Sequence, residues 1–282
     1  MQEEKTSSHS KQNLCATAIQ CSILSQYKEL TAHKIHIFDE IDSTNTEAKK
    51  RAQEEFHHGT VILAEKQTAG RGRLGRSFFS PSQSGLYMSV IYHVEHLDPM
   101  LITALSAVAV TRAIHDVYRI ETSIKWVNDV FLDGKKVCGI LTEGIINQQV
   151  KRIETAVIGI GINVYSSIET FPQDLHIIAG SLSHTTQVTH PDSFYKESRN
   201  LLCAAVLNNL FTILSSNTQT LDACIEEYRD RSFLIGKEVT VIKGYETFKA
   251  RVINITKQAH LLIEKEDKTQ EELYTGEVSI RL

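Results

Sequence analysis

Residues 65–89 read EKQTAGRGRLGRSFFSPSQSGLYMS, and at their centre three glycines and three arginines alternate over residues 70–76. Glycine tolerates positive φ angles and lets backbone N–H groups approach a ligand closely, while each arginine carries a permanent charge on a planar donor fork. Two β-rich runs flank the segment, at 60–65 and 86–94, so we predict a loop between two strands of a sheet. We expect this arginine loop (residues 70–76) to bind a small anion.

Two short motifs also match the arginine loop, but neither fits its surroundings. Gly70, Gly72 and Gly75 satisfy the dinucleotide fingerprint G-x-G-x-x-G, and residues 70–77 differ from a phosphate-binding P-loop only by Arg76 in place of lysine. Both motifs require a helix directly after the glycines, whereas SFFSP follows here. A solvated basic turn is the simpler alternative, yet such a turn does not need three interleaved glycine-arginine pairs.

Composition places the chain among ordinary globular proteins. It has 282 residues, of which 41% are hydrophobic and 23% charged, and its net charge of -4 argues against binding to nucleic acid through bulk charge. Five cysteines without C-x-x-C spacing predict free thiols and a reducing compartment. The most apolar segment, 101–118, is interrupted by Arg112, His115 and Asp116, so we expect no membrane span and a cytoplasmic location.

The hydrophobic pattern predicts an α+β fold in which a mixed β-sheet is packed with helices and a small β-barrel follows. Expected strands are 33–38, 60–65, 86–94, 121–126, 130–132, 137–143 and 152–162, and expected helices are 46–56, 101–120 and 194–214. Beyond residue 236 we expect only the short strands 238–242, 248–255, 261–264 and 273–279. The predicted divisions are a tail with a short helix (1–30), a main domain (31–232) and the barrel (233–282).

A second polar group lies in the predicted hairpin 121–143. It combines Lys125, Trp126, Asn128, Asp129 and Lys136. Taken singly, each has a structural explanation, because a lone tryptophan is usually a core residue and a lysine usually extends to solvent. Lys136, however, enters the apolar run 137–141, so we expect its ammonium group to point into a cavity.

In their order along the chain, these motifs resemble those of the biotin protein ligases. The motifs are DSTN at 42–45, the arginine loop, KWVND at 125–129, KVCGIL at 136–141, GIGIN at 159–163 and GEVSIR at 276–281. The likeness extends from about residue 35 to the C-terminus and is closest to the short form, which lacks an N-terminal DNA-binding module. Two departures are Val127, where the family usually has proline, and the absence of a glycine-rich turn near 254–260.

The resemblance implies both a fold and a reaction. The main domain would be a class II synthetase-like biotin- and ATP-binding catalytic domain, and the barrel would be SH3-like. The biotin carboxylate would attack the α-phosphate of ATP, with Mg²⁺, to give biotinyl-5′-AMP and pyrophosphate. A lysine of a biotin carboxyl carrier protein or biotin-dependent carboxylase would then accept the biotin. The expected protein is a monomer or homodimer without nucleic-acid or membrane partners and without repressor function.

The same resemblance assigns roles to individual residues. The implied catalytic residues are Arg71, Arg73, Asp129 and Lys136, and Asp129 would be either a Mg²⁺ ligand or the base for the incoming lysine. The implied biotin contacts are Ser43, Thr44, Gln67, Gly70, Arg71, Arg73, Lys136, Gly139, Leu141 and Gly159. The implied ATP and adenylate contacts are Arg71, Arg73, Arg76, Trp126, Asn128, Lys136 and Asn163.

Two other functions fit the same fold. One is a lipoate ligase or octanoyltransferase, against which the arginine loop and the terminal barrel count. The other is a non-catalytic biotin sensor, against which the presence of Lys136, both loop arginines and Asp129 counts. Pyrophosphate release from ATP in the presence of biotin distinguishes the ligase from the sensor.

Overall fold

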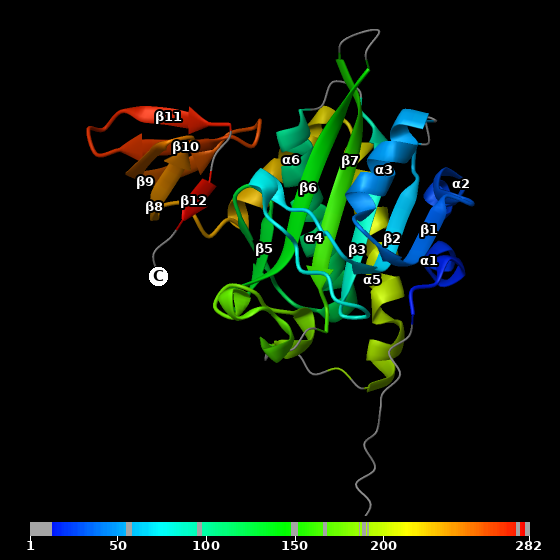
Figure 1. Cartoon of the computed structure of the whole chain (residues 1–282). Helices are drawn as coiled ribbons and strands as arrows, with labels where there is room; N and C mark the ends of the chain where they lie inside the picture. Colours follow the sequence, from blue (N-terminus) through cyan, green and yellow to red (C-terminus); the bar gives the residue numbers. More distant parts are fainter. Residues whose placement is uncertain are drawn as a thin grey trace, which may run out of the picture.

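The computed structural model describes residues 13–54, 58–94, 98–147, 152–165, 168–185, 187, 190, 192–274 and 277–279. Its centre is a seven-stranded sheet with the order β1-β2-β3-β7-β6-β5-β4 (Figure 1). The strands are β1 (Ile35–Ile41), β2 (Val61–Gln67), β3 (Gly85–His93), β4 (Ser123–Lys125), β5 (Asp129–Leu132), β6 (Lys135–Asn147) and β7 (Arg152–Asn163). β1 and β2 are parallel and the other neighbours antiparallel, so the predicted mixed sheet is confirmed.

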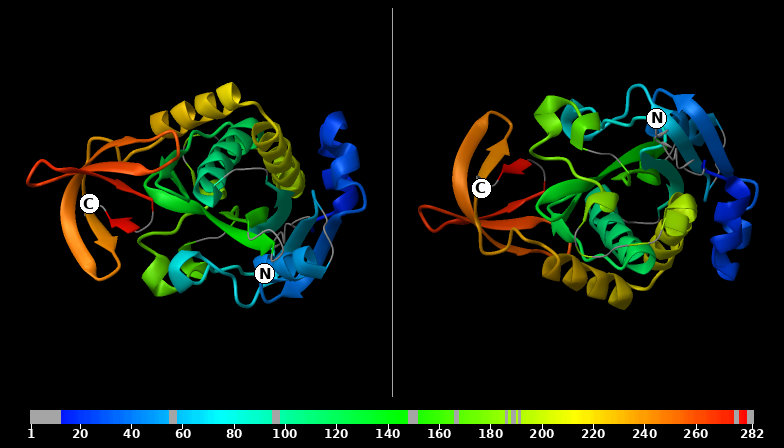
Figure 2. Two further views of the ribbon diagram at one scale, coloured as in Figure 1. Left: turned by 90° about the horizontal axis from the view of Figure 1, so that it is seen from above. Right: turned by 90° about the horizontal axis from the view of Figure 1, so that it is seen from below.

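Helices cover both faces of this sheet. α4 (Pro99–Tyr118), α5 (Asp192–Leu214) and α6 (Thr218–Asp230) lie on one face, and α3 (Thr44–Glu54) packs on the other against β2, β3 and β7 (Figure 2). The shorter helices are α1 (Ala16–Ser22), α2 (Lys28–Thr31) and the 3₁₀ turns η1 (Ser25–Tyr27), η2 (Arg73–Gly75), η3 (Ile168–Thr170), η4 (Gln173–Leu175) and η5 (Leu182–His184).

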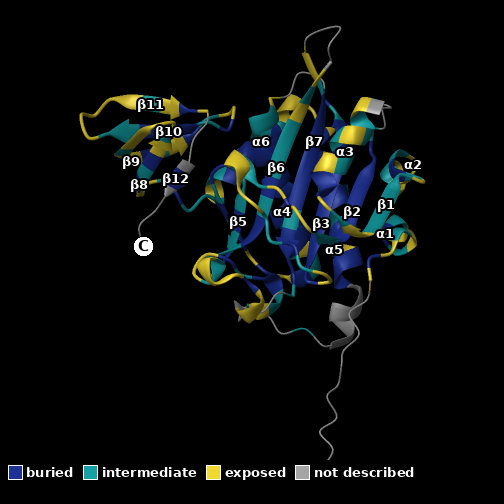
Figure 3. Ribbon diagram, viewed as in Figure 1, coloured by how far each residue is buried: buried dark blue, intermediate teal, exposed yellow. Residues whose placement is uncertain are grey.

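α4 is the central helix of the core. Asp98 caps its N-terminus by accepting a hydrogen bond from the Met100 backbone at 2.7 Å, and Pro99 occupies the first turn, where its missing N–H costs nothing. The helix is long and apolar enough to cross a membrane, but 67% of its apolar window is buried inside the protein. α4 therefore confirms the core helix that was predicted at 101–120. The strands β2, β3 and β7 are buried as well (Figure 3).

The C-terminal part forms a separate five-stranded antiparallel sheet with the order β11-β10-β9-β8-β12. Its strands are β8 (Glu238–Lys243), β9 (Glu246–Ile255), β10 (Leu261–Lys265), β11 (Gln270–Leu273) and β12 (Glu277–Ser279). β11 and β12 stand at the two ends of this order and do not pair in the described ranges, so closure of the sheet into a barrel remains a prediction. The domain boundary at residue 233 remains a prediction.

Three predictions about local structure need correction. The segment 273–279 was expected to be one strand, but β11 ends at Leu273 and β12 begins at Glu277. Asn128-Asp129 was expected to be a turn, and Asn128 does lie in one, but β5 already begins at Asp129. α6 was not predicted at all, although Asn217 caps it by accepting from the Thr220 backbone at 3.0 Å. The expected tail at 1–12 and Gly276 lie outside the described residues.

Candidate active site

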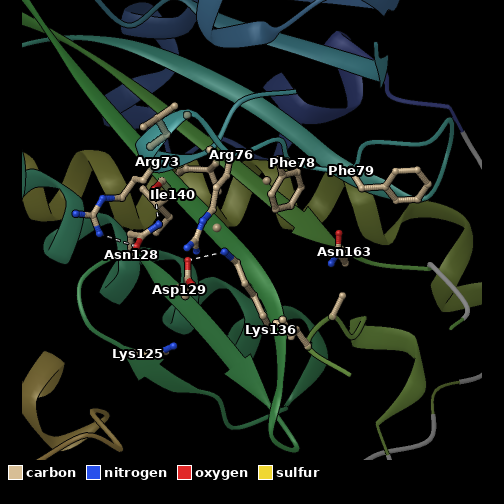
Figure 4. A pocket seen from close by; sticks show the side chains of 18 of the residues that line it. Arg73, Arg76, Phe78, Phe79, Lys125, Asn128, Asp129, Lys136, Ile140 and Asn163 are labelled. Atoms are coloured by element: carbon tan, nitrogen blue, oxygen red, sulfur yellow. Dashed lines mark hydrogen bonds and ion pairs between the residues drawn. The ribbon is translucent and has the colours of Figure 1, made fainter. Parts of the chain in front are cut away.

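A pocket of about 780 Å³ opens beside the arginine loop. Its walls come from the start of α3, the β2–β3 connection, β4, β5, β6, β7, the segment 171–179, Lys237 and Val278 (Figure 4). Six of the residues lining it are cationic, namely Arg71, Arg73, Arg76, Lys125, Lys136 and Lys237, whereas Asp129 is the one acidic lining residue in the described ranges. A pocket this rich in positive charge, on a chain of net charge -4, is suited to anionic ligands.

The arginine loop folds back on itself and crosses the pocket. The Gly72 backbone donates to the carbonyl of Arg76 at 2.7 Å, and the Phe78 backbone donates to that of Gly70 at 2.9 Å. Leu74 adopts a left-handed conformation with φ of 56°, which reverses the chain between the two halves. From this loop the Arg73 guanidinium donates to Asn128 Oδ1 at 3.2 Å (Figure 4), so the loop is linked to the opposite wall.

Lys136 points into the pocket, where its Nζ lies 2.7 Å from Asp129 Oδ1 (Figure 4). Its backbone is fixed on both sides by the segment 178–180, because its N–H donates to the carbonyl of Ile178 at 2.7 Å and its carbonyl accepts from Gly180 at 2.9 Å. The Lys136 and Asp129 side chains are 28% and 21% exposed. The ammonium group is therefore held in place but can reach a ligand.

Glycines on β6 and β7 form the floor of the pocket. Gly139 pairs with Gly161, and Leu141 pairs with Gly159. A Cβ atom at Gly161 would lie 2.5 Å from the ring of Phe78, and one at Gly159 would lie 2.0 Å from Asn45 Oδ1. These glycines therefore leave space for the neighbouring side chains to lie flat on the sheet.

A neutral hydrogen-bonding cluster closes one end of the pocket. The Thr44 backbone and hydroxyl donate to Gln67 Oε1 at 2.8 and 3.1 Å, and Gln67 Nε2 donates to Ser80 at 2.8 Å. The Ser89 hydroxyl lies 2.8 Å from that of Thr44 and 2.6 Å from Asn45 Oδ1. Thr44 and Asn45 are each only 4% exposed, so this end is pre-formed and shielded from solvent.

The nucleotide contacts implied by the resemblance line other parts of the pocket, with Asn128 and Asn163 on opposite sides of Lys136 (Figure 4). Asn163 donates to the carbonyl of Gly180 at 3.0 Å, while its buried Oδ1 accepts no hydrogen bond from any residue the structure describes. Trp126 forms part of the wall, and its Nε1 donates to the carbonyl of Ala259 at 2.8 Å. The indole therefore joins the pocket to the C-terminal sheet. The Trp126–Val127 peptide is cis.

Glu143 is the functional candidate that sequence reasoning missed. Its carboxylate accepts two hydrogen bonds from the Arg71 guanidinium at 3.0 Å each, and further ones from Asn45 and Lys49 at 3.0 Å. Burial acts to raise the pKa of Glu143, but the donors of Asn45 and Lys49 and the charge of Arg71 hold that pKa below its usual value. The available signal was its spacing, because Glu143 follows Gly139 and Leu141 on the same face of one strand.

Most of the predicted site residues lie together. All of those assigned by the resemblance line the pocket except Gly70, which packs instead against the Phe78 carbonyl and Ser80. Sequence reasoning did not select several other lining residues: Asn45, Phe78, Phe79, Phe171, Ile177 and Lys237. Within the described ranges no three His, Cys, Asp or Glu side chains gather as a metal site, so Asp129 is the single carboxylate available to a cation there.

Comparison with known proteins gives matches to both parts of the chain. The model of the "Biotin/lipoate A/B protein ligase family" matches residues 37–163, and that of the "Biotin protein ligase C terminal domain" matches residues 234–281. The two matches together cover more than half of the chain.

Individual proteins match over different lengths. "Bifunctional ligase/repressor BirA" of Bacillus spizizenii is 42% identical over 151 residues, which cover 52% of this chain and 46% of that protein, so the chain spans about half of its length. "Biotin--[acetyl-CoA-carboxylase] ligase" of Mycobacterium tuberculosis is 29% identical and covered at 74% in both chains. The biotin protein ligase from Aquifex aeolicus in complex with biotin and ATP superposes with a TM-score of 0.68 at 26% identity, covering 88% of this chain and 98% of that one.

Proposed function

Because the chain belongs to the biotin protein ligase family, we propose that it activates biotin with ATP and transfers the biotin to a lysine of an acceptor protein. The observation that carries this proposal is the pocket itself, which joins a shielded neutral cluster at one end to six cationic residues. That combination suits a ligand with an uncharged polar head and a carboxylate, brought against a nucleotide triphosphate.

The neutral cluster would hold the biotin ring. A ureido group presents one carbonyl acceptor and two N–H donors, and the hydroxyls of Ser43 and Thr44 with the amide of Gln67 supply complementary partners. Phe78, lying on Gly161, offers an apolar wall to the fused rings. The hydrogen bonds among Thr44, Gln67 and Ser89 hold these side chains in place, so the site is pre-organised for a neutral ligand.

The first step brings two anions together. The biotin carboxylate oxygen would attack the α-phosphorus of ATP, forming a mixed anhydride and releasing pyrophosphate. Lys136, Arg73 and Arg76 all extend into this region of the pocket, where positive charge lowers the repulsion between the reactants and stabilises the charge that develops on phosphorus. The Oδ1 of Asn163 would accept a hydrogen bond from the nucleotide, and Trp126, which lines the same pocket, would contact the adenylate.

We infer that Mg²⁺ enters as part of the MgATP substrate. Asp129 is the one carboxylate among the described lining residues, and Lys136 already neutralises it at 2.7 Å. Mg²⁺ commonly binds through one or two carboxylates together with substrate phosphates, so a single acidic residue is compatible with this arrangement. Bound there, the ion would neutralise charge on the phosphates.

In the second step the acceptor lysine would attack the carbonyl of the anhydride, form an amide bond and release AMP. The amine must lose a proton in this step, and Asp129 would take it. We propose a biotin carboxyl carrier protein or biotin-dependent carboxylase as the acceptor, in line with the name of the Mycobacterium tuberculosis relative. All five cysteines are free thiols, which supports our proposal that the protein works in the cytoplasm.

Calorimetric titration with biotin and with lipoate tests the proposed substrate. We expect biotin to bind and lipoate to bind at least about 100-fold more weakly, because a ring that lacks the ureido group would form no hydrogen bonds with the polar cluster. Preferential binding of lipoate would instead favour the lipoate ligase or octanoyltransferase.

Gly159→Ala should weaken biotin binding by about tenfold or more, because the added methyl group would displace Asn45 and with it the polar cluster. Gly144→Ala on the neighbouring strand is the matched control, since the atoms nearest to its methyl group belong to the exposed side chain of Ile153 and not to the polar cluster. Calorimetric titration with biotin measures the affinity of both variants. Equal affinities would exclude a role in biotin binding for the position of Asn45 against Gly159.

Arg73→Gly should impair retention of biotinyl-AMP more than its synthesis. Arg73 links the arginine loop to Asn128 across the pocket, whereas Lys136 and the metal still serve the first step. Released adenylate should then biotinylate an unrelated lysine-rich protein, as measured by streptavidin blotting against wild type. Lys66→Gln, in an exposed ion pair at the end of β2, is the control. Unchanged bystander labelling with continued pyrophosphate release would refute the retention role.

A further inference from the structure

Glu143 lies behind the pocket and does not line it, so its carboxylate acts on a ligand only through other residues. Its side chain is 17% exposed and binds the half-exposed guanidinium of Arg71 with two parallel hydrogen bonds of 3.0 Å. Bidentate pairing fixes both the position and the plane of a guanidinium group. Arg71, unlike Glu143, does line the pocket.

The pairing is asymmetric. Glu143 also accepts hydrogen bonds from Asn45 and Lys49, so its carboxylate would remain paired without Arg71. The Arg71 guanidinium has no other recorded side-chain partner within the described ranges. Glu143 therefore orients Arg71, whereas the position of Glu143 depends little on Arg71. Two of the five guanidinium N–H donors are used in this clamp, which leaves the remaining donors for a ligand.

The same carboxylate is connected to the polar cluster at the closed end. Asn45 Nδ2 donates to Glu143 Oε2 at 3.0 Å and to the carbonyl of Leu141 at 3.3 Å, while its Oδ1 accepts from Ser89 at 2.6 Å. Asn45 lies against Gly159, with no space for a Cβ atom there. The distance between the cluster and the Arg71 guanidinium is therefore set by a short chain of hydrogen bonds through Asn45 and Glu143.

We propose that Glu143 is a positioning residue that sets the length of acid the pocket accepts, by fixing Arg71 at a defined distance from the polar cluster. The inference rests on the proposed function, in which that cluster holds the biotin ring. Arg71 would then meet the carboxylate at the end of the side chain of biotin. An acid with one methylene more or fewer would place its carboxylate away from the clamped guanidinium.

Calorimetric titration with biotin, norbiotin (one methylene shorter) and homobiotin (one methylene longer) tests the proposal without requiring turnover. Wild type should prefer biotin over both homologues. Glu143→Gln removes the charge that clamps Arg71 while keeping the shape, and it should weaken biotin binding by about tenfold. The affinity of this variant for norbiotin and homobiotin should fall much less, so the ratio of the affinity for biotin to that for either homologue should decrease. A purely structural effect would instead weaken all three ligands equally.

Two further variants complete the experiment. In an Arg71→Ala background, Glu143→Gln should have no additional effect, because the carboxylate acts through the guanidinium. Arg71→Lys, which keeps the charge but cannot form the bidentate clamp, should reproduce the loss of selectivity and replaces Glu143→Gln if that variant does not fold. Lys49→Gln contacts the same carboxylate from outside the pocket and should bind all three acids within about twofold of wild type.

The outcomes separate this inference from the proposed function. Wild type that fails to bind biotin would refute both. If wild type binds biotin but Glu143→Gln keeps the same relative affinities for the three acids, the positioning role alone would be overturned. Additive effects of Glu143→Gln and Arg71→Ala would also overturn it.

Discussion

Replacing Lys136 with alanine is expected to slow formation of biotinyl-5′-AMP by about 10² to 10³, with little effect on folding. The ammonium group reaches into the pocket from β6 and is held there by Asp129 at 2.7 Å and by the backbone pairing of residue 136 with the segment 178–180. The substitution removes a fixed positive charge from the place where the biotin carboxylate must approach the phosphates of ATP. Pyrophosphate release with saturating biotin and ATP measures the change.

Lys135→Ala provides a matched control for this prediction. Lys135 is the adjacent residue, but its Nζ donates to the carbonyls of His176 and Ile177 and it does not line the main pocket. We expect adenylate formation within a few-fold of wild type in that variant. A folded Lys136→Ala protein with a wild-type rate would exclude Lys136 from the chemistry.

Replacing Arg199 with alanine is expected to destabilise the protein by about 3–5 kcal/mol, because it leaves a buried carboxylate without its cation. Arg199 and Glu65 are 2% and 7% exposed in their side chains, and Arg199 Nη1 lies 2.6 Å from Glu65 Oε2. Glu65 also accepts a hydrogen bond from the Leu14 backbone at 2.6 Å, so the pair fastens the N-terminal segment to β2. Urea unfolding followed by the fluorescence of Trp126, the one tryptophan, gives the free energy of unfolding.

Lys66→Ala, one residue further along β2, is the control for Arg199→Ala. Lys66 pairs with Glu40 at 2.7 Å, but the two side chains are 44% and 55% exposed, so water screens the interaction. An exposed pair of this kind contributes about 0–1 kcal/mol. If Arg199→Ala cost no more than Lys66→Ala, the buried pair would have no special role in holding the N-terminal segment.

Local sequence patterns were sufficient for most of the fold. β-Branched runs identified the strands of the central sheet, and the apolar segment 101–120 identified α4, because burial on all sides leaves a continuous apolar signal. The same reasoning failed where two short elements lie close together. One strand was predicted at 273–279, so β11 at Gln270–Leu273 was missed and β12 was predicted to begin too early, since both strands are only a few residues long. α6 was missed although it has an amphipathic pattern and a capping asparagine.

Sequence reasoning likewise identified only part of the candidate site. Lys136, Asp129 and the arginine loop could be selected because their residue types are unusual for a hairpin or a turn. Glu143 was not selected, although it shares a strand face with Gly139 and Leu141. A glutamate on a strand looks like a solvent-facing residue until the fold places Arg71, 72 positions earlier in the chain, against it. Gly70 was selected as a ligand contact, but it packs inside the loop and lines no part of the pocket.

The central claim is that this pocket joins biotin to AMP. The most direct measurement is mass spectrometry of the purified protein after incubation with biotin and MgATP, together with an assay for pyrophosphate and with no acceptor protein present. The predicted result is biotinyl-5′-AMP retained by the protein and pyrophosphate released in equal amount, with neither product formed from lipoate. Biotin bound without adenylate or pyrophosphate would contradict the claim and identify a sensor, and adenylate formed from lipoate alone would identify a different ligase.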